Sequence, residues 1–147
     1  MTVKTATLAS PAPWADRTGR ALMAIDAVAT LVAFTGGVMN MINASDDRLM
    51  VEGWRTFGYL VFAGMWAMLA LRPRRHPGLW ELILLQKIPV TIWAFAIGAV
   101  PEAQTASLID LGLVVTTIPA YVLCRGWYSW RTTLPTPAPT QPAGATS

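Results

Sequence analysis

The 147-residue chain is short of charged residues: 13% are Asp, Glu, Lys or Arg, whereas a soluble domain carries roughly a quarter. Hydrophobic residues make up 54% of the chain, and the mean hydropathy is +0.44. One cysteine, Cys124, and one histidine, His76, exclude an internal disulfide and a metal cage built from Cys and His. The composition therefore favours an integral membrane protein without a metal site.

The basic residues do not form a continuous stripe. Eleven Lys and Arg stand against eight Asp and Glu, for a formal charge of +3, and they fall in small groups between apolar runs. A nucleic-acid-binding protein would instead gather its Lys and Arg on one face. We therefore expect no nucleic-acid partner; the expected partners are the lipid bilayer and either another membrane protein or further copies of the chain.

Polar residues divide the chain into four apolar stretches: Arg20 to Ala44, Trp54 to Leu71, Gly78 to Val100 and Thr105 to Gly126. Each is close to the length at which a helix crosses the hydrocarbon layer. None has the alternating pattern of a barrel strand. We therefore predict an all-α fold, a four-helix transmembrane bundle over residues 20–131. Disordered tails are expected at 1–19 and, rich in Pro, Ala and Thr, at 132–147.

The basic residues also predict the topology. They are concentrated before the first stretch, between the second and third, and after the fourth: Lys4, Arg17, Arg20, Arg72, Arg74, Arg75, Arg125 and Arg131. The positive-inside rule then places both termini in the cytoplasm. The abundance of Ala, Arg, Pro and Val is typical of GC-rich coding and indicates a bacterial inner membrane.

Apart from the arginines near their ends, the apolar stretches contain four charged residues, where an unpaired charge is costly: Asp26, Glu81, Lys87 and Asp110. At about 1.5 Å per residue, Asp26 and Lys87 lie at similar depths from the cytoplasmic boundary, so we expect them to pair. Asp110 lies nearer the outer boundary, where Asn40, Arg55 or water could meet it. Glu81, near the inner surface, is expected to reach Arg20 or Arg125.

Two interpretations of these groups remain open. In the first, Asp26, Glu81 and Lys87 are catalytic candidates, with a carboxyl acting as acid or base and the lysine tuning its pKa. In the second, Lys87 and Asp26 form a buried ion pair that fixes the register of the helices. The sequence contains no nucleotide loop, metal-binding motif, serine elbow or Cys-x-x-Cys pair that would favour a known chemistry.

Two prolines inside the expected helices suggest a small polar cavity. Pro89 and Pro119 each leave one backbone carbonyl without its helical donor, and the partner must come from elsewhere. The residues expected to line such a cavity are Asn40, Thr91, Trp93, Asp110, Thr117 and Tyr121. Alternatively, neighbouring helices satisfy these carbonyls and leave no space.

Trp66 and Trp93 lie deep in their stretches, where either could stack on a flat apolar ligand such as a quinone or isoprenoid. The alternative, which we favour, is that they pack between helices with the indole N–H bonded inside the bundle. No cofactor is predicted by a motif, so a quinone or isoprenoid is the candidate ligand.

The third stretch contains the segment LLQKIPVTIWA with its single lysine, and a basic loop follows the second stretch. This layout, from Leu22 to Trp127, resembles the small bacterial membrane proteins grouped as DoxX-like. The resemblance implies a four-helix membrane fold and an association with quinone or redox partners, and it assigns no active-site residue. The expected function is an accessory or assembly subunit or a binder of a lipophilic small molecule; the alternative is an enzyme acting on an isoprenoid or other apolar substrate.

Overall fold

The computed structural model describes residues 10–98 and 100–133. Its regular structure in this part of the chain is entirely helical, as predicted: α1 (Pro13–Ile42), α2 (Asp46–Leu71), α3 (Leu79–Ile97), α4 (Pro101–Leu123) and a 3-10 helix, η1 (Gly126–Thr133). Of the tails expected at 1–19 and 132–147, residues 1–9 and 134–147 lie outside the described residues, and η1 extends over the first two residues of the second tail.

Helix α1 begins at Pro13, earlier than the expected start at Arg20. Proline is well suited to the first helical position because its φ angle is already helical and its missing N–H would have had no partner there. Asp16 in the first turn interacts favourably with the positive end of the helix dipole. These local signals extend α1 into a segment that we had assigned to the tail.

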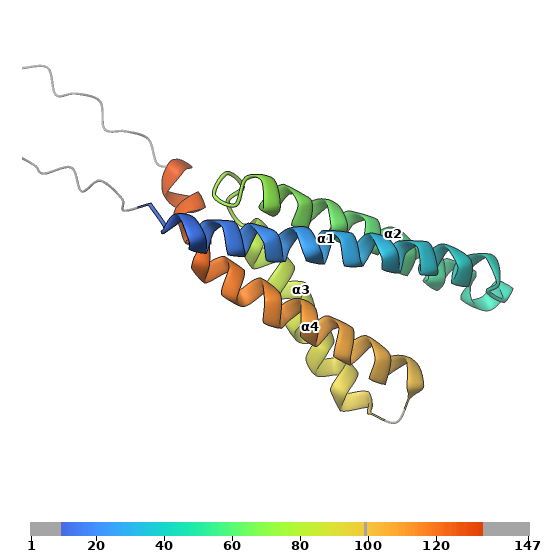
Figure 1. The fold of residues 1–147 in the computed structure, drawn as a ribbon. Coiled ribbons are helices and arrows are strands. Elements are labelled where there is room, and N and C mark those ends of the chain that lie inside the picture. The colour runs from blue at the N-terminus through green and yellow to red at the C-terminus, as the bar shows by residue number, and fades with distance from the viewer. Residues whose placement is uncertain (1–9, 99, 134–147) are drawn as a thin grey trace, which may run out of the picture.

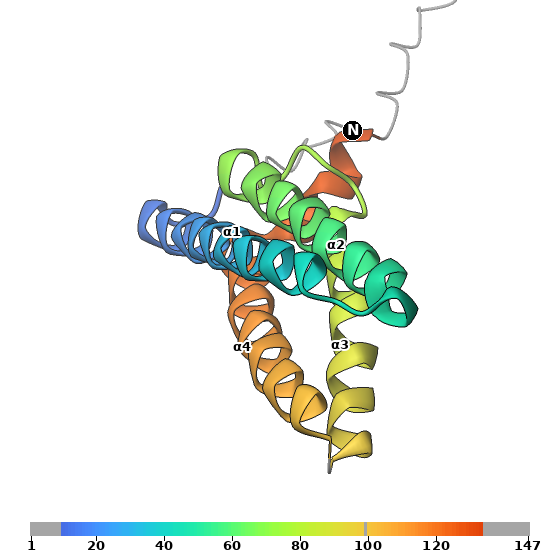
Figure 2. The same ribbon diagram turned by 90° about the vertical axis from the view of Figure 1, so that its right-hand side faces the viewer.

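The helices form two antiparallel hairpins, α1 with α2 and α3 with α4 (Figure 1). The hairpins meet at the end where both described chain ends lie, and they diverge toward the other end (Figures 1 and 2). Helix α1 also packs along α4, whereas α2 touches α3 only sparsely. The arrangement is therefore more open than the closed bundle that the sequence suggested.

A buried core lies where the hairpins meet, and all four long helices contribute to it. Its members are Met23, Ala27, Trp66, Leu69, Trp80, Ile83, Ala120 and Cys124. Trp80 is fully buried and donates its indole N–H to the carbonyl of Pro73 at 2.8 Å, which ties α3 to the preceding loop. This core holds the two hairpins together at one end only.

Three helical segments are long and apolar enough to cross a membrane: α1, α3 and the Ala103–Leu123 part of α4. Helix α2, expected to span at 54–71, is not among them. Its first half carries five charged residues, Asp46, Asp47, Arg48, Glu52 and Arg55. Arg55 and two glycines, Gly58 and Gly64, also lower the hydropathy of the expected span. The described part of the chain thus has three segments that could cross a membrane, and not the four expected.

Adjacent glycines in α1 allow a sharp test of the contact between α1 and α2. A Cβ atom at Gly37 would lie 2.8 Å from Thr56 Oγ1, whereas one at Gly36 would meet nothing within 4 Å. We expect Gly37→Val to lower the free energy of unfolding by about 1–3 kcal/mol through overpacking, and Gly36→Val to leave it nearly unchanged. Chemical unfolding in detergent measures both; equal effects would contradict the close contact.

Candidate functional site

Two nearly buried charges form an ion pair between α3 and α4. Lys87 Nζ lies 2.7 Å from Asp110 Oδ1, and the two side chains are only 8% and 12% exposed. The expected pairing of Lys87 with Asp26 is therefore wrong. Helix α3 ends earlier and α4 begins earlier than expected, so Lys87 and Asp110 both lie about 14–15 Å from the turn that joins their helices.

Two aromatic rings of α2 complete the surroundings of Lys87. Its ammonium lies 4.6 Å from the ring centre of Phe62 and 5.8 Å from that of Trp66, distances at which a cation is attracted to a ring face. Trp66 is fully buried and donates its indole N–H to Thr117 Oγ1 at 3.2 Å. The packing interpretation of Trp66 is confirmed. The role of Phe62 was missed, although its position one turn before Trp66 places both rings on one face.

Asp26 faces α4 and is 3% exposed. The hydroxyl of Thr116 lies 2.8 Å and 3.0 Å from its two carboxylate oxygens. Thr30, on the same face of α1, donates its hydroxyl to the backbone carbonyl of Asp26 rather than to the carboxylate. Among the described residues, no Lys or Arg forms an ion pair with Asp26, whereas Asp110, the other buried carboxyl of the candidate spans, is paired with Lys87. The sequence analysis missed Thr116.

Glu81 holds the C-terminal 3-10 helix against the bundle. Its Oε1 accepts hydrogen bonds from the hydroxyl of Tyr121 at 2.9 Å and the indole of Trp130 at 3.1 Å. The expected partners are elsewhere: Arg20 donates to a backbone carbonyl of α2, and Arg125 to a tyrosine of η1. Glu81 therefore joins α3, α4 and η1 at the end where the hairpins meet.

The remaining pocket candidates do not gather around one space. Asn40 is exposed near the far end of α1. Trp93 is 67% exposed one turn before the end of α3, so its indole is not bonded inside the bundle as we favoured. Thr91 is buried, but its hydroxyl donates to the carbonyl of Lys87 within the same helix. The predicted cavity residues are thus divided among separate contacts.

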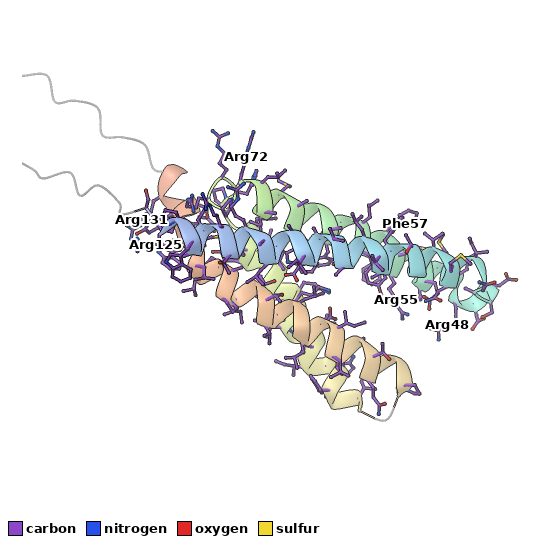
Figure 3. The ribbon with its side chains drawn as sticks, in the orientation of Figure 1. Arg48, Arg55, Phe57, Arg72, Arg125 and Arg131 are labelled. Atoms are coloured by element: carbon purple, nitrogen blue, oxygen red, sulfur yellow. The ribbon has the colours of Figure 1, made fainter. Side chains whose placement is uncertain are left out.

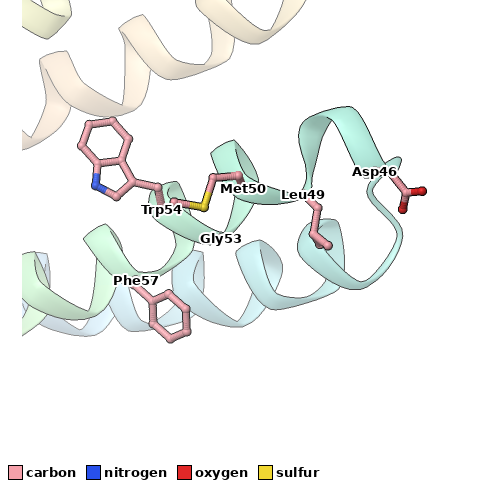
Figure 4. A pocket seen from close by; sticks show the side chains of 6 residues that line it. All are labelled: Asp46, Leu49, Met50, Gly53, Trp54 and Phe57. Carbon is pink, nitrogen blue, oxygen red and sulfur yellow. The ribbon is translucent and has the colours of Figure 1, made fainter.

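Two surface hollows occur elsewhere. One of about 520 Å³ lies along the start of α2 (Figure 4), lined by Asp46, Leu49, Met50, Gly53, Trp54 and Phe57. The other, of about 550 Å³, lies between the start of α1 and the end of α4. Neither is lined by Asp26, Lys87 or Asp110. These charges therefore act within helix contacts and not in either hollow.

Within residues 10–98 and 100–133, no group of three His, Cys, Asp or Glu side chains could hold a metal ion. The chain matches no family model, no curated protein and no solved structure. Interpretation of the site therefore depends on its own geometry, in which the contacts of Lys87, Asp26 and Glu81 through their side chains join two or three elements.

Two fully buried threonines provide a matched test of these polar contacts. Thr117 Oγ1 accepts the indole N–H of Trp66, whereas Thr56 Oγ1 has no hydrogen-bond partner. We expect Thr117→Val to cost about 1–3 kcal/mol because it leaves a buried donor unsatisfied. Thr56→Val should be neutral or stabilising. Unfolding in detergent compares them, and a larger loss from Thr56→Val would contradict the assignment.

A second charge cluster lies near the start of α2, ahead of the expected span at 54–71. Glu52 is 5% exposed, with Arg48 Nη2 at 2.9 Å and Arg55 Nη1 at 3.3 Å. The hydrogen bond from Arg48 holds the pKa of Glu52 below its usual 4.5, against the opposing effect of desolvation. A carboxyl group whose pKa is lower in the folded than in the unfolded state stabilises the fold at any pH above its unfolded-state pKa. This stabilisation is lost as the pH falls through its folded-state pKa.

This cluster predicts that the end of the molecule where the two hairpins diverge is sensitive to acid. On acidification below its usual pKa of 4.5, the wild type should lose more thermal stability than Glu52→Gln does. At neutral pH, Glu52→Gln should cost about 0.5 kcal/mol, as for other partly exposed pairs. Melting curves across the acidic range measure both effects. Parallel pH profiles of the two proteins would contradict the prediction.

Proposed function

We propose that the chain is an accessory or assembly subunit of a membrane complex, in which the intramembrane charges have structural roles. The enclosure of Lys87 carries this proposal. Asp110 and two aromatic rings surround its ammonium, and Glu81 is engaged by Tyr121 and Trp130. Lys87, Asp110 and Oε1 of Glu81 are thus engaged in contacts between helices, which supports a protein that acts through its surface.

The proposal places both termini in the cytoplasm. Helix α2 returns alongside α1, and both described chain ends lie at the same end of the molecule (Figure 1). Arg72, Arg125 and Arg131 are at that end, whereas Arg48 and Arg55 lie toward the other (Figure 3). This distribution agrees with a positive-inside arrangement.

The surface offered to a partner is apolar and helical. Ile25 of α1 is 61% exposed, Leu85 of α3 is 70% exposed and Val115 of α4 is 59% exposed. Helices associate within a bilayer through close packing of such faces and not through burial from water. A membrane-protein partner or a second copy of this chain would pack against one of these faces, and lipid would cover the others.

Site-specific photocrosslinking tests this proposal. A photoreactive phenylalanine analogue is placed at Ile25, Leu85 or Val115, one position at a time, in the full chain in its native membrane. We expect one position to give a discrete protein adduct and the other two to give lipid adducts only. Lipid adducts at all three, together with a monomeric mass in mild detergent, would contradict a subunit role.

Asp26 supports a second candidate, chemistry on an isoprenoid or binding of a quinone. It is the buried carboxyl of the described spans without a cationic partner, and a neutral hydroxyl is the group that contacts it. Native mass spectra of the wild type and of Asp26→Asn distinguish the two functions. A lipophile that co-purifies with the wild type and is lost from the folded Asp26→Asn variant would favour the second candidate. Thr116→Val, which removes the hydroxyl that contacts Asp26, is the matched control.

A further inference from the structure

The hollow of about 550 Å³ lies between the first turn of α1 and the end of α4, where the two hairpins meet. Its lining includes Trp14, Val122, Leu123, Arg125, Trp127 and Tyr128, and Arg125 is the one charged residue among all those that line it. We propose that this hollow binds an anionic phospholipid, with the phosphate at Arg125 and an acyl chain along α4.

Cationic and hydroxyl groups converge at the polar side of the hollow. Arg125 Nη1 donates to the hydroxyl of Tyr128 at 3.1 Å, and its guanidinium lies 5.6 Å from the centre of that ring. The guanidinium of Arg131 lies 5.4 Å from the same ring. Guanidinium groups bind phosphate oxygens in a two-pronged geometry. Tyr128 accepts from Arg125, and both residues line the hollow, so its hydroxyl lies beside the guanidinium there.

The rim of the hollow is apolar and continues onto the lipid-facing side of α4. Trp14 is 67% exposed and Val122 is 55% exposed. Val122 follows Ile118 and Val115 at helical spacing, and these are 43% and 59% exposed. Aromatic side chains such as Trp14 favour the boundary between headgroups and hydrocarbon. A phospholipid uses both the cationic side and the apolar strip, whereas a free phosphate ion would use only the first.

The backbone conformation of Arg125 suggests a substitution that removes the guanidinium without destabilising the fold. Its φ angle is +51°, and no other non-glycine residue in the described part of the chain has a positive φ. The position directly follows the C-cap of α4, where glycine is the usual left-handed residue. An arginine here is strained and glycine would not be. Arg125→Gly should therefore fold at least as well as the wild type while it removes the guanidinium.

Native mass spectrometry of the full-length protein in mild detergent tests the site. The protein is titrated separately with phosphatidylglycerol and with phosphatidylcholine. We expect the wild type to retain one phosphatidylglycerol about tenfold more strongly than phosphatidylcholine, and Arg125→Gly to lose this preference. Arg72→Gln, which removes an exposed charge from the loop between α2 and α3 (Figure 3), is the control and should keep it.

Three outcomes would overturn the proposal. Arg125→Gly that keeps the full preference would exclude this hollow as the site. An equal loss in Arg72→Gln would indicate a diffuse attraction between the basic end and anionic lipid. Displacement of the bound phosphatidylglycerol by an excess of inorganic phosphate would indicate a site for the free anion and not for a lipid.

Discussion

Replacing Lys87 with Met should lower the free energy of unfolding by about 3–5 kcal/mol, the usual cost of removing one partner from a buried ion pair. The variant leaves the carboxylate of Asp110 in an apolar setting, because both side chains are nearly buried and the ammonium is the group that neutralises it. The loss includes two ring contacts, with Phe62 and Trp66. Unfolding of the purified protein in mixed detergent micelles measures this change.

The double variant Lys87→Met/Asp110→Leu is the decisive control. Two apolar side chains of similar volume remove both charges together, so most of the lost stability should return. A double variant no more stable than the single one would show that the charges are not coupled. A single variant as stable as the wild type would contradict a structural role for the pair, and with it the main support for the proposed function.

The helical class and the rough positions of the four long helices followed from the lengths of the apolar stretches. The pairing of the charges did not, because it depends on helix ends. Moving the end of α3 from Val100 to Ile97 and the start of α4 from Thr105 to Pro101 changes the depth of Asp110 by about one turn. That shift is enough to replace Asp26 by Asp110 as the partner of Lys87.

Other parts of the site could not be predicted because polar residues in spans have several neighbours within reach. Thr116 resembles any other small polar residue of α4, and its contact with Asp26 depends on the rotation of α4 against α1. The divergence of the hairpins also has no local sequence signal. It arises because the core joins them at one end, where Trp66, Trp80 and Met23 are buried. The resemblance to DoxX-like proteins stays a prediction.

The same core explains the second large effect, expected from Trp66→Ala. Trp66 is fully buried in α2, is hydrogen-bonded to Thr117 and lies against the ring of Phe62, with the two rings tilted by 41° and their centroids 5.7 Å apart. We expect a loss of about 3 kcal/mol, at the low end of the range for large core residues. Unfolding within a bilayer moves the indole from the protein interior to lipid and not to water. Lost packing therefore makes up most of the stability that Trp66→Ala loses.

Trp54 provides the matched control on the same helix, because it is 80% exposed. Trp54→Ala should change the free energy of unfolding by less than about 0.5 kcal/mol, as is usual for surface positions. The stability lost in Trp66→Phe should lie between the losses in Trp54→Ala and Trp66→Ala, since this variant keeps a ring near Lys87 but loses the hydrogen bond to Thr117. Similar losses for Trp54→Ala and Trp66→Ala would mean that the two hairpins are not joined through this core. The positions of Lys87 and Asp26 relative to α2 and α4 would then need to be reassigned.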